Sequence, residues 1–356
     1  SEGVLVSQYS YFSNEFNGEQ NTWYSNGNHR EHLICEMGVL VYREAWYLSG
    51  EKKLVESYQN GVPHGRWAIY PDPAFTKDTF PATVDNYFQG NKHGLHLAYL
   101  NGIKIEEYVY HDGQLDGQAT KWNSSGQTEV VELYRRGELH GISEYRQNGM
   151  LLRISNYSDG RKHGLETDYD RGGSVLKSSW FADGKVDSVY SYHSNGRKAT
   201  SRIYTYTGSE KSETSVYSEF DTAGLRLLSG NYINEQKTGQ WKTFYPTGKT
   251  RSVTNYVNGK VNGLFTKYYA NGKKMIEMNI FENGINTQPD VWNEKGKAIK
   301  MGTKEYNEIV DGNKPGEVFN DPSEYNRAII DKRIDEIILR QPDQNGEGYE
   351  NQIEGD

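Results

Sequence analysis

The 356-residue sequence is poor in apolar residues and in cysteine. Hydrophobic residues make up 35% of the chain and the mean hydropathy is -0.87. Compact domains carry about 45–50% apolar residues, so one deep hydrophobic core is not expected. Cys35 is the single cysteine, which excludes an internal disulfide bond, and its neighbours Leu33 and Ile34 favour a buried structural side chain. No apolar run approaches the roughly 18 residues of a transmembrane helix.

Recognised active-site motifs are also missing. The sequence has no Gly-x-Ser-x-Gly, His-Glu-x-x-His, phosphate-binding loop or dinucleotide-binding fingerprint. We therefore expect no catalytic residue and no cofactor, and a protein that is not an enzyme.

Glycine and tyrosine are abundant, with 38 and 28 residues, and they recur together as Tyr-x-x-Gly-x-x-x-Gly. The steps from Tyr87 to Tyr110, Tyr134, Tyr157 and Phe181 are 23, 24, 23 and 24 residues. A fixed period of this size is typical of a stack of identical supersecondary units. The paired glycines, which we assign to structural turns, are Gly61 and Gly65, Gly90 and Gly94, Gly113 and Gly117, Gly137 and Gly141, Gly160 and Gly164, and Gly259 and Gly263.

Each unit has the pattern of a β-hairpin. Residues 95–99 are apolar at every second position, as in a half-buried strand, and Asn101-Gly102 follows. Asn-Gly between two strands predicts a type I′ turn, which needs positive φ at both residues. The equivalents are Asn26-Gly27, Ser49-Gly50, Asn148-Gly149, Asn195-Gly196 and Asn271-Gly272. Tyrosine suits such a sheet, because its ring can pack on the next repeat while the hydroxyl stays in water.

An aromatic residue stands five positions after the second glycine, as at Tyr70, Tyr99, Trp122, Tyr169 and Tyr268. With it, the motif resembles the MORN repeat, and the longer Asn-Gly hairpin resembles the bacterial variant in the YwqK family of antitoxins and immunity proteins. The resemblance covers roughly residues 20–300. The hairpin pattern and the resemblance both predict an all-β fold, an elongated single-layer repeat sheet of consecutive antiparallel β-hairpins. The residues after 312 add a C-terminal capping α-helix. Ser188 replaces a second glycine, Tyr232…Gly239 lacks a first one, and 197–228 match poorly.

These features divide the chain into three parts. Residues 1–312 form the repeat array, with an insertion at 71–86 and an irregular wide repeat at 197–228. Residues 313–341 are a linker and a capping helix, which Asp321-Pro322 and the isoleucines of 330–338 predict over 321–340. Residues 342–356 contain five acidic residues and no lysine or arginine, which indicates a disordered acidic tail.

Four of the nine histidines, His64, His93, His140 and His163, precede the second glycine of a motif. Asp116 and Asn262 fill the same position elsewhere. Asp, Asn and His tolerate unusual φ, so we attribute the position to turn geometry. Successive repeats should also spread these histidines along the array, so we expect no metal site.

The net charge of the chain helps to choose between the possible binding partners. Forty basic and 48 acidic residues give a net charge of -8, which disfavours nucleic acid and an anionic membrane surface as partners. The resemblance implies an immunity protein that binds and occludes the active site of a cognate toxin effector, for which we expect a membrane-acting phospholipase encoded next door. The alternative is a lipid-surface binder or a scaffold. We expect the chain to be a monomer when no partner is bound.

Partner-binding residues are expected where the repeat is interrupted. Pro71, Pro73 and Pro81 forbid a regular strand, so the insertion should project as a loop. We expect its aromatic and acidic residues and two flanking tryptophans to bind the partner; these are Asp72, Phe75, Asp78, Phe80, Trp46 and Trp67. For Trp46 and Trp67 the alternative is packing between repeats. The start at Ser1, the lack of disulfides and the resemblance favour a periplasmic location with a lipoprotein anchor, and the cytoplasm is the alternative.

Overall fold

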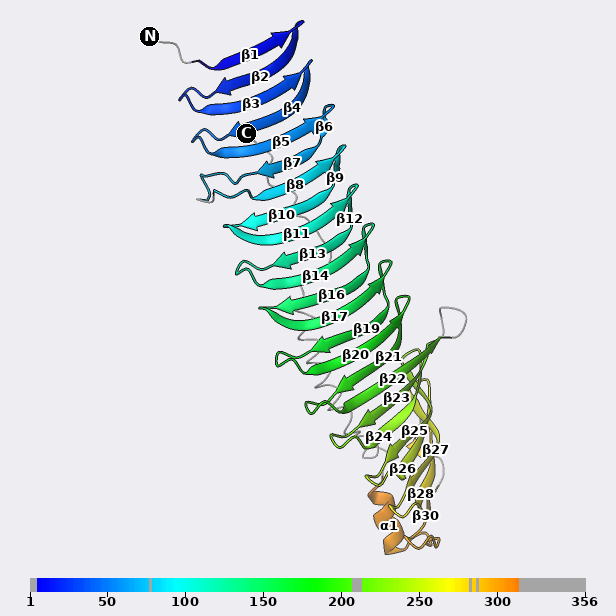
Figure 1. The fold of residues 1–356 in the computed structure, drawn as a ribbon. Helices are drawn as coiled ribbons and strands as arrows, with labels where there is room; N and C mark the ends of the chain where they lie inside the picture. Colours follow the sequence, from blue (N-terminus) through cyan, green and yellow to red (C-terminus); the bar gives the residue numbers. More distant parts are fainter. Residues whose placement is uncertain (1–4, 77–78, 207–212, 282–283, 286–287, 314–356) are drawn as a thin grey trace. The chain divides into compact units, whose positions relative to one another are not determined.

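The computed structural model describes residues 5–76, 79–206, 213–281, 284–285 and 288–313 (Figure 1). It is an open antiparallel sheet of consecutive β-hairpins with one α-helix near the C-terminal end of the described residues. The chain divides into two compact units, residues 1–187 and 188–356, and the boundary lies within β21 (Lys185–Tyr192). Each unit is described separately.

Unit 1 arranges its strands in chain order, and each long strand pairs with the next (Figure 1). Its strands are β1 (Ser7–Phe12), β2 (Glu15–Trp23), β3 (His29–Glu36), β4 (Val39–Trp46), β5 (Lys52–Gln59), β6 (Val62–Pro63), β7 (Gly65–Ile69), β8 (Thr83–Phe88), β9 (Asn91–Lys92), β10 (Gly94–Leu100), β11 (Ile103–His111), β12 (Gln114–Leu115), β13 (Gly117–Trp122), β14 (Thr128–Arg135), β15 (Glu138–Leu139), β16 (Gly141–Gln147), β17 (Met150–Ser158), β18 (Arg161–Lys162), β19 (Gly164–Tyr169) and β20 (Val175–Ala182).

Unit 2 continues with hairpins and ends in the helix. Its elements are β22 (Lys198–Tyr206), β23 (Glu213–Phe220), β24 (Arg226–Ile233), β25 (Gln236–Phe244), β26 (Thr250–Val257), β27 (Lys260–Tyr268), β28 (Lys274–Phe281), β29 (Gly284–Ile285), β30 (Asp290–Val291) and α1 (Lys304–Asp311). Within the expected irregular repeat at 197–228, β22 and β23 pair without a bulge from Thr200↔Glu219 to Tyr206↔Glu213.

The first glycine of each motif closes a two-residue turn. After β5, Asn60 and Gly61 have φ of 52° and 76°, as a type I′ turn requires. The second glycine is also left-handed. At Gly117 φ is 128° and an added Cβ would lie 3.0 Å from the Cβ of Val109, so a side chain is excluded by both conformation and space.

The type I′ prediction for the Asn-Gly pairs is confirmed at Asn101-Gly102 and Asn148-Gly149, where both φ values are positive. It is wrong at Asn26-Gly27, Ser49-Gly50, Asn195-Gly196 and Asn271-Gly272, where the glycine alone has positive φ. In the first of these the N–H of Gly27 donates to the carbonyl of Tyr24 at 2.9 Å, and the N–H of Tyr24 donates to Asn28 at 2.8 Å. The loop between Tyr24 and Asn28 therefore has three residues instead of two. In such a loop only the last residue, here Gly27, needs the left-handed conformation.

Successive tight turns of unit 1 are joined by a repeated hydrogen bond. The N–H of Gly113 donates to the carbonyl of Lys92 at 2.8 Å, and the N–H of Gly184 donates in the same way to Lys162 at 2.8 Å. Gly90, Gly137 and Gly160 make the equivalent bonds to Pro63, Leu115 and Leu139. We name this row of turns the turn ladder; it comprises residues 60–61, 89–90, 112–113, 136–137, 159–160 and 183–184. The bond requires each turn to recur one repeat later, which accounts for the regular period.

Two of the motif tyrosines use their hydroxyls within the sheet and do not leave them to water as expected. Tyr58 donates to Oε2 of Glu56 at 2.9 Å, and Tyr134 donates to Oε2 of Glu132 at 2.8 Å. Burial, together with the hydrogen bond to Glu56, raises the pKa of Tyr58 to about 12. In both cases the acceptor is a glutamate two residues before the tyrosine. Residues two apart in a strand lie on the same face of the sheet, so the glutamate can reach the hydroxyl.

Unit 2 contains the helix and two clusters of buried apolar residues. Phe265, Ile276, Met278, Ile280, Val291 and Tyr306 form one cluster, and Tyr217, Leu228, Tyr232 and Trp241 form the other. Tyr306 of α1 lies in the first cluster and its hydroxyl donates to the carbonyl of Pro289 at 2.8 Å. The helix thus covers the last hairpin, as a cap should, but over 304–311. The helix expected over 321–340 and the tail at 342–356 lie outside the described residues.

Candidate functional site

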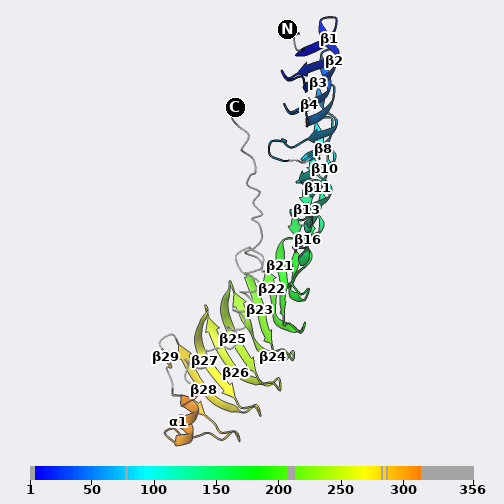
Figure 2. The ribbon, with the colours of Figure 1, turned by 90° about the vertical axis from the view of Figure 1, so that its left-hand side faces the viewer.

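The segment expected as an insertion is a loop between neighbouring strands of unit 1. The strands β7 and β8 pair from Gly65↔Tyr87 to Ile69↔Thr83, and the chain between them leaves the sheet (Figure 2). Its described residues contain no strand, as the prolines predicted. The loop ends earlier than expected, because β8 already starts at Thr83. We name residues 70–82 the contact loop.

The two phenylalanines of the contact loop are turned to solvent. Phe75 is 90% exposed and Phe80 is 61% exposed. Asp72 has a different role, because its Oδ1 accepts the N–H of Ala74 at 2.8 Å and its carbonyl accepts the N–H of Phe75 at 3.0 Å. Asp72 therefore shapes the turn that presents Phe75. Asp78 lies outside the described residues.

The two flanking tryptophans are both partly buried in aromatic packing. The ring of Trp67 lies 5.2 Å from that of Tyr58 and 5.0 Å from that of Tyr87, and its Nε1–H donates to the carbonyl of Ser57 at 2.8 Å. Trp46 packs on His29, with ring centroids 5.3 Å apart. The structure thus places both residues in the packing role that was their alternative interpretation.

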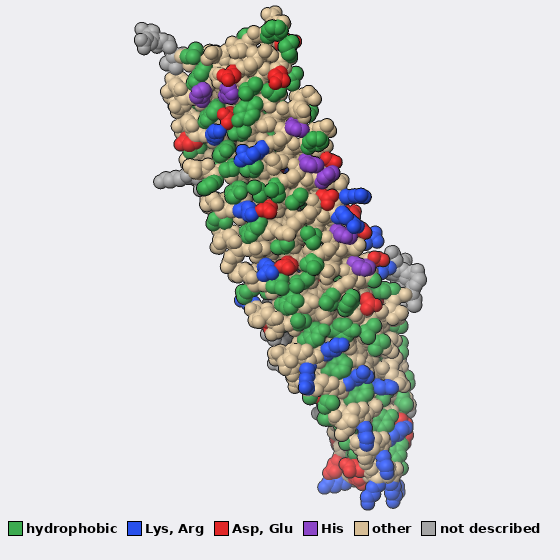
Figure 3. Space-filling model, viewed as in Figure 1, with side chains coloured by type: hydrophobic (Ala, Val, Ile, Leu, Met, Phe, Trp, Pro, Cys, Tyr) green, Lys and Arg blue, Asp and Glu red, His purple; other side chains and the backbone are tan. Residues whose placement is uncertain are grey.

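A second feature follows the turn ladder, where histidines line one edge of unit 1 (Figure 3). His140 Nδ1 lies 3.6 Å from Oδ1 of Asp159, and His163 Nδ1 lies 3.4 Å from Oδ1 of Asp183. The hydrogen bonds between turns create these pairs, because each brings the turn of one repeat beside the histidine of the repeat before it.

The explanation of this histidine position by unusual φ is wrong. The positive φ values occur at the residue before the first glycine, for example Asp112 at 48° and Asp159 at 48°, and not at the histidines. Histidine instead supplies a side chain that faces the next turn.

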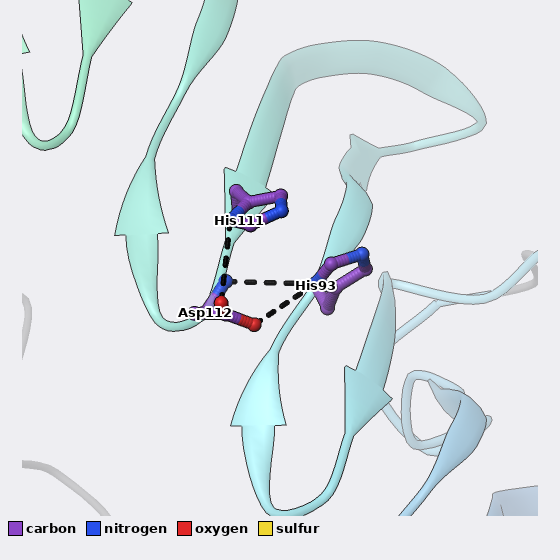
Figure 4. A group of neighbouring side chains, drawn as sticks. All are labelled: His93, His111 and Asp112. Carbon is purple, nitrogen blue, oxygen red and sulfur yellow. Dashed lines mark hydrogen bonds and ion pairs between the residues drawn. The ribbon is translucent and has the colours of Figure 1, made fainter.

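Two histidines lie beside one turn of the turn ladder, at residues 112–113. His93, His111 and Asp112 each place a potential metal-ligating atom within 4.8 Å of the others (Figure 4). His93 comes from the segment after β9, whereas His111 ends β11 and Asp112 starts the next turn. The sequence did not predict this group, because His111 has no fixed position in the repeat and the contact joins turns of two consecutive repeats. A spacing of 18 and 19 residues from His93, just short of one period, is the signal that would have shown it.

Arg135 and Asp159 form an ion pair at the turn ladder. Nη2 of Arg135 lies 2.5 Å from Oδ1 of Asp159, and both residues line a shallow hollow with Arg136 and Glu138. The hydrogen bond from Arg135 holds the pKa of Asp159 below its usual value.

The sheet of unit 1 also contains a histidine that is held as a cation. Nδ1 of His96 lies 2.7 Å from Oδ1 of Asp85, and Nε2 lies 3.7 Å from Oε2 of Glu106. The hydrogen bond with Asp85, and then the nearby carboxylate of Glu106, raise the pKa of His96 to about 9 against the effect of burial. The group is a structural ion cluster within the sheet, and sequence analysis did not identify it.

Comparison with known proteins identifies the repeat. The model of the MORN repeat variant matches residues 237–258 and 261–283. These two segments are MORN-variant repeats. They correspond to the hairpin steps from β25 to β26 and from β27 to β28 of unit 2.

No curated protein sequence matches the chain. Among solved structures, the crystal structure of TcdB2-TccC3-TEV is similar at 12% identity, over 81% of this chain and 19% of that chain, with a TM-score of 0.16. That similarity carries no argument about function. In the described part of the chain, no helix has both the length and the apolar character needed to cross a membrane.

Proposed function

We propose that this MORN-repeat protein binds another protein, with the contact loop as the centre of the interface. The exposure of Phe75 is the observation that carries the proposal. A phenylalanine that a hydrogen-bonded turn holds out from the sheet leaves apolar surface in water, and burying it against a partner recovers that free energy. Aromatic anchors of this kind dominate the binding energy of protein interfaces.

We propose further that the partner is a bacterial toxin effector and that the chain acts as its immunity protein by occlusion, without chemistry of its own. The resemblance of the repeats to those of antitoxins supports this assignment. The net charge of -8 also supports it, because an acidic surface steers association with the basic active-site cleft of an enzyme that acts on phospholipid or nucleic acid. A membrane-acting phospholipase met in the periplasm is the partner that we favour.

The test compares two variants for binding to the protein encoded by the neighbouring gene. Phe75→Ala with Phe80→Ala should weaken binding by at least about 30-fold, since hot-spot truncations cost about 2 kcal/mol or more. Leu48→Ala is the matched control, because Leu48 is exposed in the turn after β4 and lies outside the contact loop.

Neutralisation of the partner's activity should follow the same order as binding. Equal binding by the double variant and the wild type would show that the contact loop is not the interface. Capture of the chain by anionic phospholipid vesicles at physiological salt, with no binding to the neighbouring protein, would replace the proposal by the lipid-surface alternative.

A further inference from the structure

We propose that His93, His111 and Asp112 form a binding site for a zinc-class divalent metal ion on the edge of unit 1. The three side chains converge from two successive repeats (Figure 4). The proposal is independent of the contact loop and of the partner discussed above.

The distances suit tetrahedral coordination. Nδ1 of His93 lies 3.3 Å from Oδ1 of Asp112, and Nδ1 of His111 lies 3.4 Å from Oδ2 of the same carboxylate. Ligand atoms about 2.0 Å from a tetrahedral Zn²⁺ lie about 3.3 Å from one another. All three potential ligand atoms lie within 4.8 Å of one another, so side-chain rotations alone would bring one oxygen and two imidazole nitrogens to one ion.

The backbone holds the ligands in place before any ion arrives. The N–H of Gly113 donates to the carbonyl of Lys92, which fixes the turn of Asp112 beside His93. The two imidazole rings also pack together, with centroids 4.7 Å apart. Metal binding thus orders few additional groups, which favours affinity.

The interactions that an ion would displace are weak. The N–H of Asp112 lies 3.5 Å from Nδ1 of His93, at the outer limit of a hydrogen bond. Both histidine–carboxylate contacts exceed 3.2 Å and lie at the protein surface. The imidazole nitrogens can therefore turn to a metal at little cost.

The ligand set selects the class of metal. Two imidazoles and one carboxylate suit Zn²⁺ and its neighbours in the first transition row, whereas Mg²⁺ and Ca²⁺ prefer oxygen ligands alone. Three protein ligands leave the fourth position of a tetrahedral ion open to water.

A later repeat contains two of the three ligand positions. It therefore supplies a control variant and a place to introduce the missing ligand. His163 and Asp183 make the same contact at 3.4 Å, but Ala182 stands where His111 would be. His163→Ala should therefore leave Zn²⁺ binding unchanged, whereas Ala182→His should create a second site of the same composition.

Calorimetric titration of the full chain with ZnCl₂ tests the proposal. The wild type should bind one equivalent, and His93→Ala or His111→Ala should lower the affinity by at least about tenfold, as even outer-shell changes at metal sites do. Ala182→His should bind two equivalents. With Co²⁺, the wild type should give the intense visible absorption of a tetrahedral ion, and His111→Ala should not.

Circular dichroism establishes that each variant is folded, which is expected because both histidine side chains are partly exposed. Non-saturable binding, an unchanged affinity in His111→Ala, or a single equivalent in Ala182→His would each overturn the proposal.

Discussion

The two units place different residues at the same position of the same repeat. In unit 1 the second residue after the second glycine is His96, Ala119, Ser143 or Glu166, with Trp67 as the aromatic exception. In unit 2 it is Trp241 and Phe265, which are 3% and 0% exposed. One backbone plan therefore supports two kinds of interior.

Unit 1 contains ion pairs within its sheet that involve buried carboxylates. Nε of Arg153 lies 2.5 Å from Oδ1 of Asp168, and Nζ of Lys162 lies 2.5 Å from Oε2 of Glu166, whose side chain is buried. Among the described residues, many of the buried apolar side chains of unit 1 are alanines. The glycine-rich turns and hydrogen-bonded strands set the fold there, and the interior can remain polar as long as each charge is paired.

Unit 2 has the apolar clusters and the helix that covers one of them. Aromatic packing is close enough to exclude a side chain from the neighbouring strand, since a Cβ on Gly230 would lie 2.2 Å from the Trp241 ring. The comparison predicts that unit 2 is sensitive to loss of volume and that unit 1 is sensitive to loss of charge.

The largest expected effect is in unit 2. Phe265→Ala should lower the free energy of unfolding by about 3–5 kcal/mol, because it removes a fully buried ring and leaves a cavity. Urea unfolding combined with hydrogen exchange of residues 260–281 measures the loss. Leu264→Ala, on the opposite face of the strand and exposed, should change it by less than about 0.5 kcal/mol. Equal losses at the two positions would mean that the buried ring of Phe265 gives unit 2 no special sensitivity to loss of volume.

The next effect concerns the charged interior of unit 1. Arg153→Met should destabilise by about 2 kcal/mol, below the usual cost of breaking a buried pair, because Lys177 Nζ remains 3.9 Å from Asp168. Adding Asp168→Leu should recover most of the loss, because the uncompensated charge disappears. Unfolding of the two variants and of Asp168→Leu alone completes a double-mutant cycle. A coupling energy near zero would mean that the pair contributes nothing.

Much of the fold follows from the sequence, because the glycine period and the strand alternation are local signals. The position of α1 was missed although a signal existed: Thr303 accepts the N–H of Tyr306 at 3.3 Å, and Glu305 stands in the first turn. The helix has only eight residues and one buried side chain, Tyr306, so its apolar pattern is weak. The longer pattern of apolar residues at 321–340 gave the stronger helix signal.

The candidate sites were predicted less well. Phe75 and Phe80 could be selected because prolines interrupt the repeat, and the structure exposes both. His93, His111 and Asp112 meet only through the hydrogen bond between turns, and no property of one repeat alone reveals that contact. The ion cluster of His96 was also not visible in one repeat, because its partners Asp85 and Glu106 come from the two neighbouring strands.

The smallest expected effect is a dependence of unit 1 on pH. Because the pKa of His96 is raised to about 9 in the fold, above its value of about 6.5 in an unfolded chain, its contribution is complete below pH 6.5 and is lost as the pH rises to 9. Asp85 and Glu106 have lowered pKa values, so their contribution is lost in acid.

Hydrogen exchange of residues 94–111 at pH 6 and pH 9 measures this change. We expect the wild type to lose about 1 kcal/mol of local stability between these values, since solvent screening and the pairing of Lys92 with Asp85 limit the effect. His96→Gln should remove the difference, whereas His163→Gln, with a half-exposed ring, should retain it. The exchange of residues 260–281, where unit 2 has its apolar interior, should vary less over the same range once the intrinsic exchange rate is corrected for. A pH dependence of equal size in both units would mean that the polar interior of unit 1 does not set its response.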